Sequence, residues 1–426
     1  MTRLGFYFFN IIWYNKNMDK VILHCDLNNF YASVEIATNK ELGGKPIIVC
    51  GDPENRHGIV LAKNQLAKNC GIKTGDTVYE AKEKCPSVVP VPPHFEKYVY
   101  YSRKVFEIYN NYTDKIEYFG IDECWLDVTG SIKLFGSGKE IADRLRQEVK
   151  DKYNLTISVG VSFTKPFAKL GSDLKKPDAT TVIDRSNFKE VAWNLPCGDL
   201  IMVGRRTEKK LNEMGIITIG DLARANRDIM REKFGIVGVN LVNTALGIDN
   251  EQVRYAGESV PPKSVSNGTT TKSDMTNKED AIRVIYALSD LVAYRLRKLN
   301  MNCSGVGLFY KYNDFTGEQK NCKLPFTTDS ATEIGKIASS ILVNSVNFNY
   351  KPLRAITVSC YGLKQNDEGS QVTFDTPRLE KNKKIDETLD KIKSKYGYDS
   401  IVRGVLVGND LNKSLHADDD FKPFQR

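Results

Sequence analysis

The chain has few of the residues that form nitrogen- and sulfur-ligated metal sites. Only four of its 426 residues are histidine, and its nine cysteines lie singly, with no C-x-x-C pair. Zinc ribbons need closely paired cysteines or histidines, and small disulfide scaffolds need an even set of cysteines in a short chain. Both classes are therefore disfavoured, and the cysteine pattern fits a reducing cytoplasm.

The sequence also lacks an apolar run long enough to cross a membrane. Residues 4–14, LGFYFFNIIWY, are shorter than the roughly 20 residues of a membrane-spanning helix, and no small-x-small cleavage site follows them. Met18 opens MDKVILHCDL, where a strand is predicted to begin at once. Residues 1–18 are thus either a non-native extension or a disordered tail, and we expect a cytoplasmic protein with no membrane partner.

The chain does contain enough apolar sequence for several cores, together with an excess of positive charge. Hydrophobic residues make up 41% and charged residues 27% of the chain, and the formal net charge is +8. A chain of this length is expected to form about two to four domains. The basic balance favours an anionic partner such as nucleic acid.

Composition divides the chain into five parts. Residues 19–190 alternate short apolar runs with helical patterns, residues 191–255 are helical with two short glycine-punctuated hairpins, and a linker rich in Pro and Ser covers 256–264. Residues 265–366 predict two helices and two strands, SGVGLFYKY and RAITVSCYG. The tail, 367–426, is polar and charged, with one helix predicted near KIDETLDKIKSKYG.

Two motifs place acids where predicted strands end. In HCDLNNFYASVE (24–35), an apolar strand runs into Asp26. In KIEYFGIDECWLDVT (115–129), alternating apolar residues predict a β-hairpin with Asp122 and Glu123 at its turn. Each motif alone has an ordinary structural explanation, since Asp before Asn-Asn is a common helix cap and Asp-Glu is a common solvated turn. Together, each fed by an apolar strand, they favour a functional site.

The chemistry that suits such a site is divalent-metal chemistry. Adjacent, partly desolvated carboxylates repel each other, and a divalent cation removes that cost. Mg²⁺ prefers hard oxygen ligands such as carboxylates and backbone carbonyls. If the two motifs meet, Asp26, Asp122, Glu123 and the Leu27 carbonyl could hold two metals roughly 3.5–4 Å apart, as in phosphoryl transfer.

The motifs DLNNFYASVE and GIDECWLDVT resemble the two signatures of the Y-family translesion DNA polymerases, of the bacterial DNA polymerase IV type. Three further segments resemble that family in the same order along residues 19–366. GDPENRHGIVLAKNQLAKNCGIKTGD is similar to its fingers segment, GVSFTKPFAKLGSDLKKPDATTVI to its palm segment, and LIMVGRRTEKKLNEMGIITIGDLA to its helix-hairpin-helix thumb.

The resemblance implies an α+β multidomain, right-hand polymerase. Its parts would be a βαββαβ-type palm (19–190) with fingers inserted at about 36–95, a thumb (191–255), and a C-terminal α/β little finger (265–366). The implied activity is error-prone, template-directed DNA synthesis in DNA repair, by nucleotidyl transfer from a dNTP to a primer 3′-hydroxyl with two Mg²⁺ ions. The implied partners are primer–template DNA and dNTPs, and we expect a monomer.

The resemblance also implies roles for individual residues of the catalytic site. Asp26, Asp122, Glu123 and the Leu27 carbonyl match the metal ligands, and Glu123 matches the residue usually given as catalytic. Tyr31 matches the steric gate that excludes a ribose 2′-hydroxyl. Phe30, which would pack beneath it, is either a nucleotide-binding residue or, as we favour, an ordinary core residue.

The nucleotide contacts of the resemblance are less regular. Gln65 and Lys68 stand where the family usually has Tyr and Arg, so nucleotide affinity or geometry is expected to differ. Lys176 matches a lysine that contacts phosphate.

Two segments are predicted to contact DNA. Gly204, Arg205, Arg206 and Lys209 lie at a helix start, where backbone N–H groups bind phosphate without reading sequence. Thr270, Thr271 and Lys272 are expected to run along template phosphates. Residues 264–366 hold 13 Lys and Arg against 8 Asp and Glu, a net of +5, as duplex binding requires.

The segment QVTFD (371–375) is either a sliding-clamp-binding peptide, through Gln371 and Phe374, or an ordinary linker; Thr373 stands where such peptides usually have Leu.

Two rival functions also stay open. One is a palm-fold nucleotidyl cyclase acting on free nucleotides, and the other is a DNA-bound accessory without catalysis.

Overall fold

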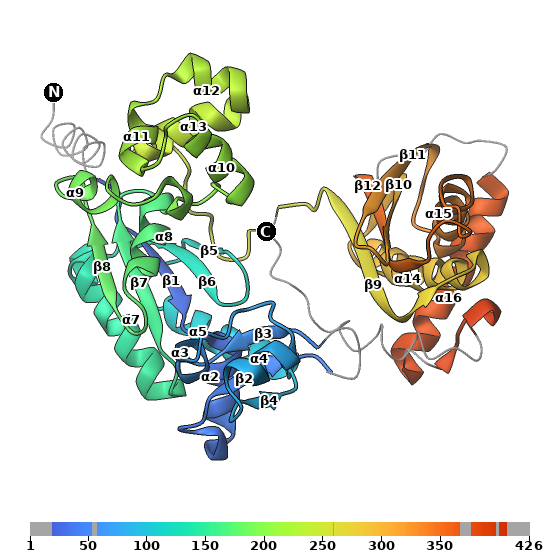
Figure 1. The fold of residues 1–426 in the computed structure, drawn as a ribbon, viewed down its shortest axis with the longest axis horizontal. Helices are drawn as coiled ribbons and strands as arrows, with labels where there is room; N and C mark the ends of the chain where they lie inside the picture. Colours follow the sequence, from blue (N-terminus) through green and yellow to red (C-terminus); the bar gives the residue numbers. More distant parts are fainter. Residues whose placement is uncertain (1–18, 53–57, 259, 367–375, 398–399, 407–426) are drawn as a thin grey trace, which may run out of the picture. The chain divides into compact units, whose positions relative to one another are not determined.

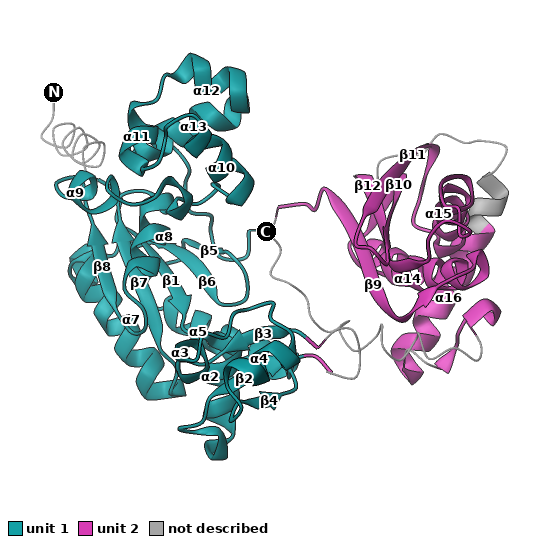
Figure 2. Ribbon diagram, in the orientation of Figure 1, with its two compact units in different colours: residues 1–50, 59–259, 423–426 teal, residues 51–58, 260–422 magenta. Residues whose placement is uncertain are grey.

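The computed structural model describes residues 19–52, 58–258, 260–366, 376–397 and 400–406. The chain forms two compact units that divide near residue 260, coloured separately in Figure 2. Among the helices described, none combines the length and apolarity needed to cross a bilayer.

The first unit is built on a five-stranded mixed sheet (Figure 1). Its strand order is β5 (Ile116–Tyr118), β6 (Glu123–Asp127), β1 (Ile22–Leu27), β7 (Ile157–Ser162) and β8 (Thr180–Ile183). β1 pairs antiparallel with both β6 and β7, and β7 pairs parallel with β8. All six residues of β1 are buried, as expected of a central strand.

Helices cover both faces of this sheet. The helices that follow or connect its strands are α2 (Phe30–Thr38), α5 (Phe95–Tyr109), α6 (Ile132–Phe135), α7 (Gly138–Tyr153), α8 (Lys165–Leu174) and α9 (Phe188–Ala192). α7 begins with a capping box between Ser137 and Glu140. Gly138 of α7 faces Val161, whereas α8 faces Gly160, so α7 and α8 lie on opposite faces because strand residues alternate.

A close approach sets the position of α8. A Cβ added to Gly160 would overlap the carbonyl of Ala168, so only glycine at this point of β7 lets α8 lie against the sheet. His24 and Asp26 of β1 point to the same face as Gly160. α8 is therefore held directly over the strand that carries Asp26.

Two smaller regions complete the first unit. A three-stranded sheet of order β3 (Val60–Lys63), β2 (Ile47–Cys50) and β4 (Val89–Val91) carries α3 (Gln65–Asn69) and α4 (Val78–Lys84), with a 3₁₀ turn at Lys40–Leu42 before it. After a 3₁₀ turn at Cys197–Asp199 come α10 (Arg205–Glu213), α11 (Ile219–Arg224), α12 (Arg227–Phe234) and α13 (Ile236–Ala245). The helical prediction for 191–255 is thus confirmed.

The second unit is a four-stranded antiparallel sheet with helices. Its strand order is β11 (Gly317–Thr328), β10 (Met301–Tyr312), β12 (Leu353–Gln365) and β9 (Ser264–Met275), and its helices are α14 (Lys278–Lys298), α15 (Ala331–Ser345) and α16 (Thr376–Tyr396), followed by a 3₁₀ turn at Gly404–Leu406. The sequence predicted only two of these strands, and the antiparallel order makes the unit α+β rather than α/β.

The helix α16 belongs to this second unit, beyond the boundary at 366 that the sequence analysis set. Arg297 of α14 forms an ion pair with Asp390 at 2.6 Å, and Arg403 pairs with Asp290 at 2.6 Å. The buried Asp386 accepts a hydrogen bond from the backbone N–H of Ala331, the first residue of α15. These contacts fix α16 against both α14 and α15.

Candidate active site

The three predicted acids meet where β1 and β6 lie side by side. Asp26 is paired in register with Glu123, and the backbone N–H of Leu27 donates to the carbonyl of Asp122 at 3.0 Å. Asp122 ends the turn after β5, and Glu123 is the first residue of β6. The structure thus confirms the predicted hairpin and brings the two acidic motifs together.

Two lysines from the α8 region neutralise these acids. Lys176 Nζ lies 2.6 Å from Asp26 Oδ2. Lys169 Nζ lies 3.0 Å from Glu123 Oε2, 3.4 Å from Asp26 Oδ2 and 3.3 Å from Asp173 Oδ2. Four carboxylates, including that of Asp122, therefore face two ammonium groups, which leaves an excess of negative charge.

The surroundings of these acids shift their pKa values in different directions. Burial and the charges of Glu123 and Asp26 raise the pKa of Asp122 to about 6. Burial also raises the pKa of Asp26, against the opposing charge of Lys176. For Glu123, burial is outweighed by the contact with the His24 ring and the charge of Lys169, which lower its pKa to about 2.

His24 is a site residue that the sequence analysis missed. Its ring is fully buried, with Nδ1 2.9 Å from Ser172 Oγ and Nε2 3.4 Å from Glu123 Oε2. Burial lowers the pKa of His24 to about 4, so the ring is neutral near pH 7. Its position two residues before Asp26, on the same face of β1, was the available signal.

The donor set suits a hard divalent cation. Glu123 Oε2 is a buried oxygen whose nearest charged contact is Lys169 Nζ at 3.0 Å, and the surrounding acids offer only oxygen ligands. The side chains are nevertheless arranged around lysines: within the described part of the chain, no three His, Cys, Asp or Glu side chains are placed to hold a metal ion. A cation therefore requires Lys169 or Lys176 to release its carboxylate.

Asn28 and Asn29, the Asn pair that follows Asp26, have separate structural roles. The Asn28 side chain donates to Ser158 Oγ at 2.9 Å and accepts from the backbone N–H of Asp178, also at 2.9 Å. It thereby ties the loop that carries Lys176 to β1. Asn29 has φ 50°, a left-handed conformation that Asn tolerates, and it turns the chain into α2.

Tyr31 lies on the first turn of α2 within an aromatic cluster. Its ring stacks on Tyr98, with centroids 4.3 Å apart and planes at 10°, and meets Phe95 edge-on. The Tyr98 hydroxyl donates to Glu35 Oε1 at 2.5 Å, and burial raises the pKa of Tyr31 to about 12. Phe30 is buried beneath these rings, as expected.

The other predicted contacts fall into three groups. Gln65 and Lys68 are exposed on α3, and Gln65 Nε2 donates to Asn69 Oδ1. Gly204 is the N-cap of α10, which carries Arg205, Arg206 and Lys209, all exposed. The third group lies on the edge strand β9 and comprises Thr270, Thr271 and Lys272.

Thr271 and Lys272 differ in accessibility. Lys272 is exposed, but Thr271 is buried and its hydroxyl donates to the carbonyls of Ser273 and Arg354. Thr271 is thus occupied within the sheet. Gln371 and Phe374 lie outside the described residues.

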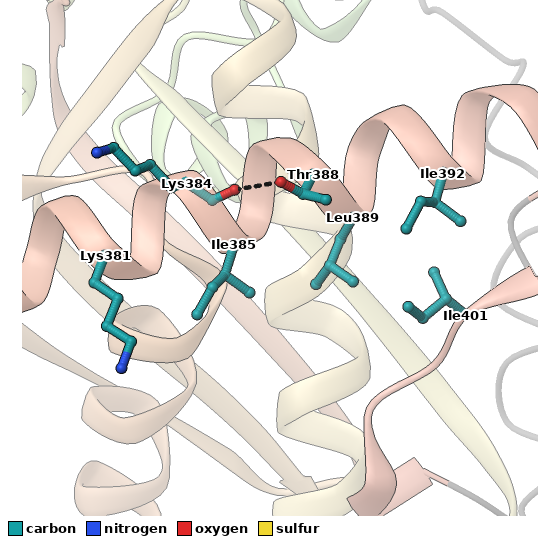
Figure 3. Close-up of a pocket in the computed structure, with 7 residues that line it drawn as sticks. All are labelled: Lys381, Lys384, Ile385, Thr388, Leu389, Ile392 and Ile401. Atoms are coloured by element: carbon teal, nitrogen blue, oxygen red, sulfur yellow. Dashed lines mark hydrogen bonds between the residues drawn. The ribbon is translucent and has the colours of Figure 1, made fainter.

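A concave surface along α16 is a different kind of site (Figure 3). Its side chains are mainly apolar and include no carboxylate, and they come from Lys381, Lys384, Ile385, Thr388, Leu389, Ile392 and Ile401. Without acids or convergent polar groups, it lacks the means for the chemistry of the β1–β6 acids.

Protein-family models match two segments that together cover more than half of the chain. Residues 25–173 match the impB/mucB/samB family, and residues 262–374 match the C-terminal domain of the same family. The chain is 44% identical to DNA polymerase IV of Acetivibrio thermocellus, over 92% of this chain and 98% of that one. It is 34% identical to DNA polymerase IV of Clostridium acetobutylicum, over 92% and 99%.

Solved structures agree with the sequence matches. A Y-family DNA polymerase chimera of Dbh and Dpo4 superposes with a TM-score of 0.71 at 25% identity, covering 81% of this chain and all of that one. DinB from Sulfolobus solfataricus shares the fold, with a TM-score of 0.54 at 24% identity over 80% and 98% of the two chains. The chain therefore belongs to the Y-family of translesion DNA polymerases, in the DNA polymerase IV group.

Proposed function

We propose that this chain extends a DNA primer by template-directed nucleotidyl transfer at Asp26, Asp122 and Glu123. The observation that carries the proposal is the meeting of these acids across β1 and β6, with Lys169 and Lys176 as their counter-charges. Polymerases of this family generally use divalent metal ions. The finer proposal is that two Mg²⁺ ions are held by the three carboxylates and the Leu27 carbonyl.

The two ions would stabilise the charge on the attacking and leaving oxygens of phosphoryl transfer. The protein's own residues prepare that arrangement. Asn28 holds the Lys176 loop, and His24 lies against Glu123 so that its carboxylate stays near Asp26. When Lys176 releases Asp26, its ammonium group is free to contact the triphosphate of a dNTP, and Gln65 and Lys68 of α3 would bind the same group.

The aromatic cluster gives sugar selection a physical basis. Tyr31 cannot easily move away from an incoming sugar, because its ring stacks on Tyr98 and Tyr98 is anchored to the buried Glu35. A fixed ring at this position would leave no room for a 2′-hydroxyl. Glu123 and Tyr31 would thus act separately, one on the reacting phosphate and the other on the sugar.

DNA is proposed to bind at two surfaces that carry exposed cations. The N-terminus of α10 offers backbone N–H groups at Gly204 and Arg205 beside Arg206 and Lys209, which suits a phosphate. On β9, Lys272 and Thr270 are the proposed template contacts, and Thr271 is left out because it is buried. Such contacts position the duplex without reading its sequence.

The first prediction concerns catalysis. Asp122→Ala should lower primer extension by on the order of 10³-fold, because the site loses a carboxylate that would hold the Mg²⁺ ions, and these ions would stabilise the charge that develops at the phosphate. Extension of an undamaged primer–template with Mg²⁺ and four dNTPs measures this, and Asp151→Ala, an exposed acid on α7, is the control. Equal activity of Asp122→Ala and wild type would contradict the proposal. Wild type that binds DNA but does not extend it would indicate an accessory role, with Gln65 and Lys68 as the disabling changes.

The second prediction concerns sugar selection. Tyr31→Ala should raise ribonucleotide incorporation relative to deoxyribonucleotide incorporation by at least about tenfold, since a shaped pocket discriminates by roughly 1–3 kcal/mol per group. Tyr31→Phe keeps the ring and should keep the selectivity. Single-nucleotide incorporation kinetics measure the ratio of ribonucleotide to deoxyribonucleotide incorporation. An unchanged ratio in Tyr31→Ala would contradict the role of Tyr31 as the steric gate.

The third prediction concerns Lys169, one of the two lysines that neutralise the acids. Lys169→Met should destabilise the metal-free protein by about 3 kcal/mol, because it leaves buried carboxylates with one ammonium group fewer. Mg²⁺ should then restore stability in the variant more than in wild type. Thermal unfolding with and without Mg²⁺ measures both effects. The neighbouring exposed Lys175→Met is the control, and an equal response of the two variants to Mg²⁺ would argue against the exchange of lysine for metal.

The fourth prediction concerns a protein partner. We propose that Gln371 and Phe374 bind a bacterial sliding clamp, on the basis of the sequence QVTFD alone. Phe374→Ala should then lose retention on immobilised clamp while primer extension without clamp stays unchanged. Equal retention of variant and wild type would show that the segment is a linker.

A further inference from the structure

Two thiols lie close together in the three-stranded-sheet region of the first unit. Cys70 follows the last residue of α3, and Cys85 follows the last residue of α4. Their sulfur atoms are 3.1 Å apart, although the residues are 15 positions apart in sequence. A disulfide bond is roughly 2.0 Å long, so the two sulfurs need only a small approach to become bonded.

The two thiols have complementary properties. Cys70 is exposed to solvent, whereas Cys85 is 5% exposed and also lies 3.6 Å from Ser87 Oγ. The contact with Cys70 lowers the pKa of the Cys85 thiol and raises that of Cys70. One thiol is thus accessible to a reagent, and its neighbour is the better nucleophile, because the thiolate is the reactive form.

Other neighbouring cysteines provide an internal comparison. Cys25 and Cys124 are paired in register across β1 and β6, and Cys303 contacts Cys360 between β10 and β12. All four are at most 1% exposed. Burial raises the pKa of Cys124 well above its usual range, and all four thiols are shielded from solvent. Among the described cysteines, Cys70 and Cys85 therefore differ from the other neighbouring pairs, because their sulfur atoms lie close together and one of the two residues is exposed to solvent.

We propose that Cys70 and Cys85 form an oxidation site at which a peroxide converts the two thiols into a disulfide. The peroxide transfers one oxygen to the Cys70 sulfur, giving a sulfenic acid and water. The Cys85 thiolate then attacks that sulfur, forms the S–S bond and expels hydroxide, which takes up the proton lost by Cys85 to give a second water. Two electrons pass from the sulfurs to the peroxide, and a dithiol reductant reverses the change.

The position of the bond links it to nucleotide binding, a consequence that rests on the proposed function. α3 carries Gln65 and Lys68, and Gln65 is hydrogen-bonded at 2.8 Å to Asn69, the neighbour of Cys70. A disulfide would tie the end of α3 to the end of α4 and restrict this short helix. We expect the oxidised protein to show a KM for dNTP raised severalfold, with kcat little changed.

The site itself is tested by mass spectrometry of the full chain, independently of any activity. The protein is treated with a small excess of hydrogen peroxide, its remaining thiols are alkylated, and it is digested with trypsin without reductant. The expected product links peptide 69–73 (NCGIK) to peptide 85–97 (CPSVVPVPPHFEK), lighter by two hydrogens than the two free peptides and separated by dithiothreitol. Peptides with Cys25, Cys124, Cys303 and Cys360 should remain alkylated.

Two variants make the test specific. Cys70→Ser should abolish the linked product, whereas Cys322→Ser, which removes a single half-buried thiol in the other unit, should form it as wild type does. Alkylation of both Cys70 and Cys85 after peroxide treatment, or a sulfinic acid at Cys70 in place of the link, would overturn the proposal.

Primer-extension kinetics on the same samples separate the site from its consequence. A reversible rise in KM supports the coupling to α3. A linked product with unchanged KM would keep the oxidation site and refute its effect on the nucleotide, and an inactive reduced protein would count against the proposed function alone.

Discussion

The structure of the first unit depends on one electrostatic constraint, the balance of buried carboxylates by lysines from α8 and the loop after it. Asp26 and Glu123 are fixed by the pairing of β1 with β6, so they cannot separate to relieve their repulsion. Lys169 reaches them only because α8 lies close to the sheet, and that approach is possible only with glycine at position 160. The fold therefore brings positive charge to the acids, and this charge offsets the repulsion between their carboxylates.

A second constraint holds the Tyr31 ring in place. Tyr31 and Glu35 lie one helical turn apart on α2, and Tyr98 bridges them, stacking on the first and donating a hydrogen bond to the second. The carboxylate of the buried Glu35 also lies 2.9 Å from His94 Nδ1 and 3.6 Å from Lys97 Nζ, so it has three partners. The proposed selectivity for the sugar would thus rest on the hydrogen bond that anchors Tyr98 as much as on the Tyr31 ring itself.

The sequence revealed those parts of the site whose residues show a strong local pattern. β1 is an apolar run that leads into Asp26, and β6 is an apolar run that follows Asp122 and begins at Glu123; both strands were predicted, with these acids at those ends. β9 and β11 were missed because much of their surface is exposed; residues 317–321, GEQKN, show no apolar alternation. Lys169 and His24 were missed for another reason: each contacts Glu123, which is distant from both in sequence. The contact of Lys169 is visible only once α8 lies on the sheet, and that of His24 only once β1 pairs with β6.

The position of the helix α16 could not be predicted from its sequence either. Its sequence is charged enough to suggest a solvated tail, yet Arg297 is only 12% exposed at its side chain and is held by Asp390 of that helix. A buried guanidinium without its carboxylates would carry an uncompensated charge, which is far more costly than an exposed one. Asp386 adds a cap for α15 and lies 3.4 Å from Arg403, so the helix satisfies groups on three elements at once. Such charges specify where α16 lies, because an alternative position would leave each of these groups without its partner. Residues 376–397 and 400–406 are therefore part of the fold.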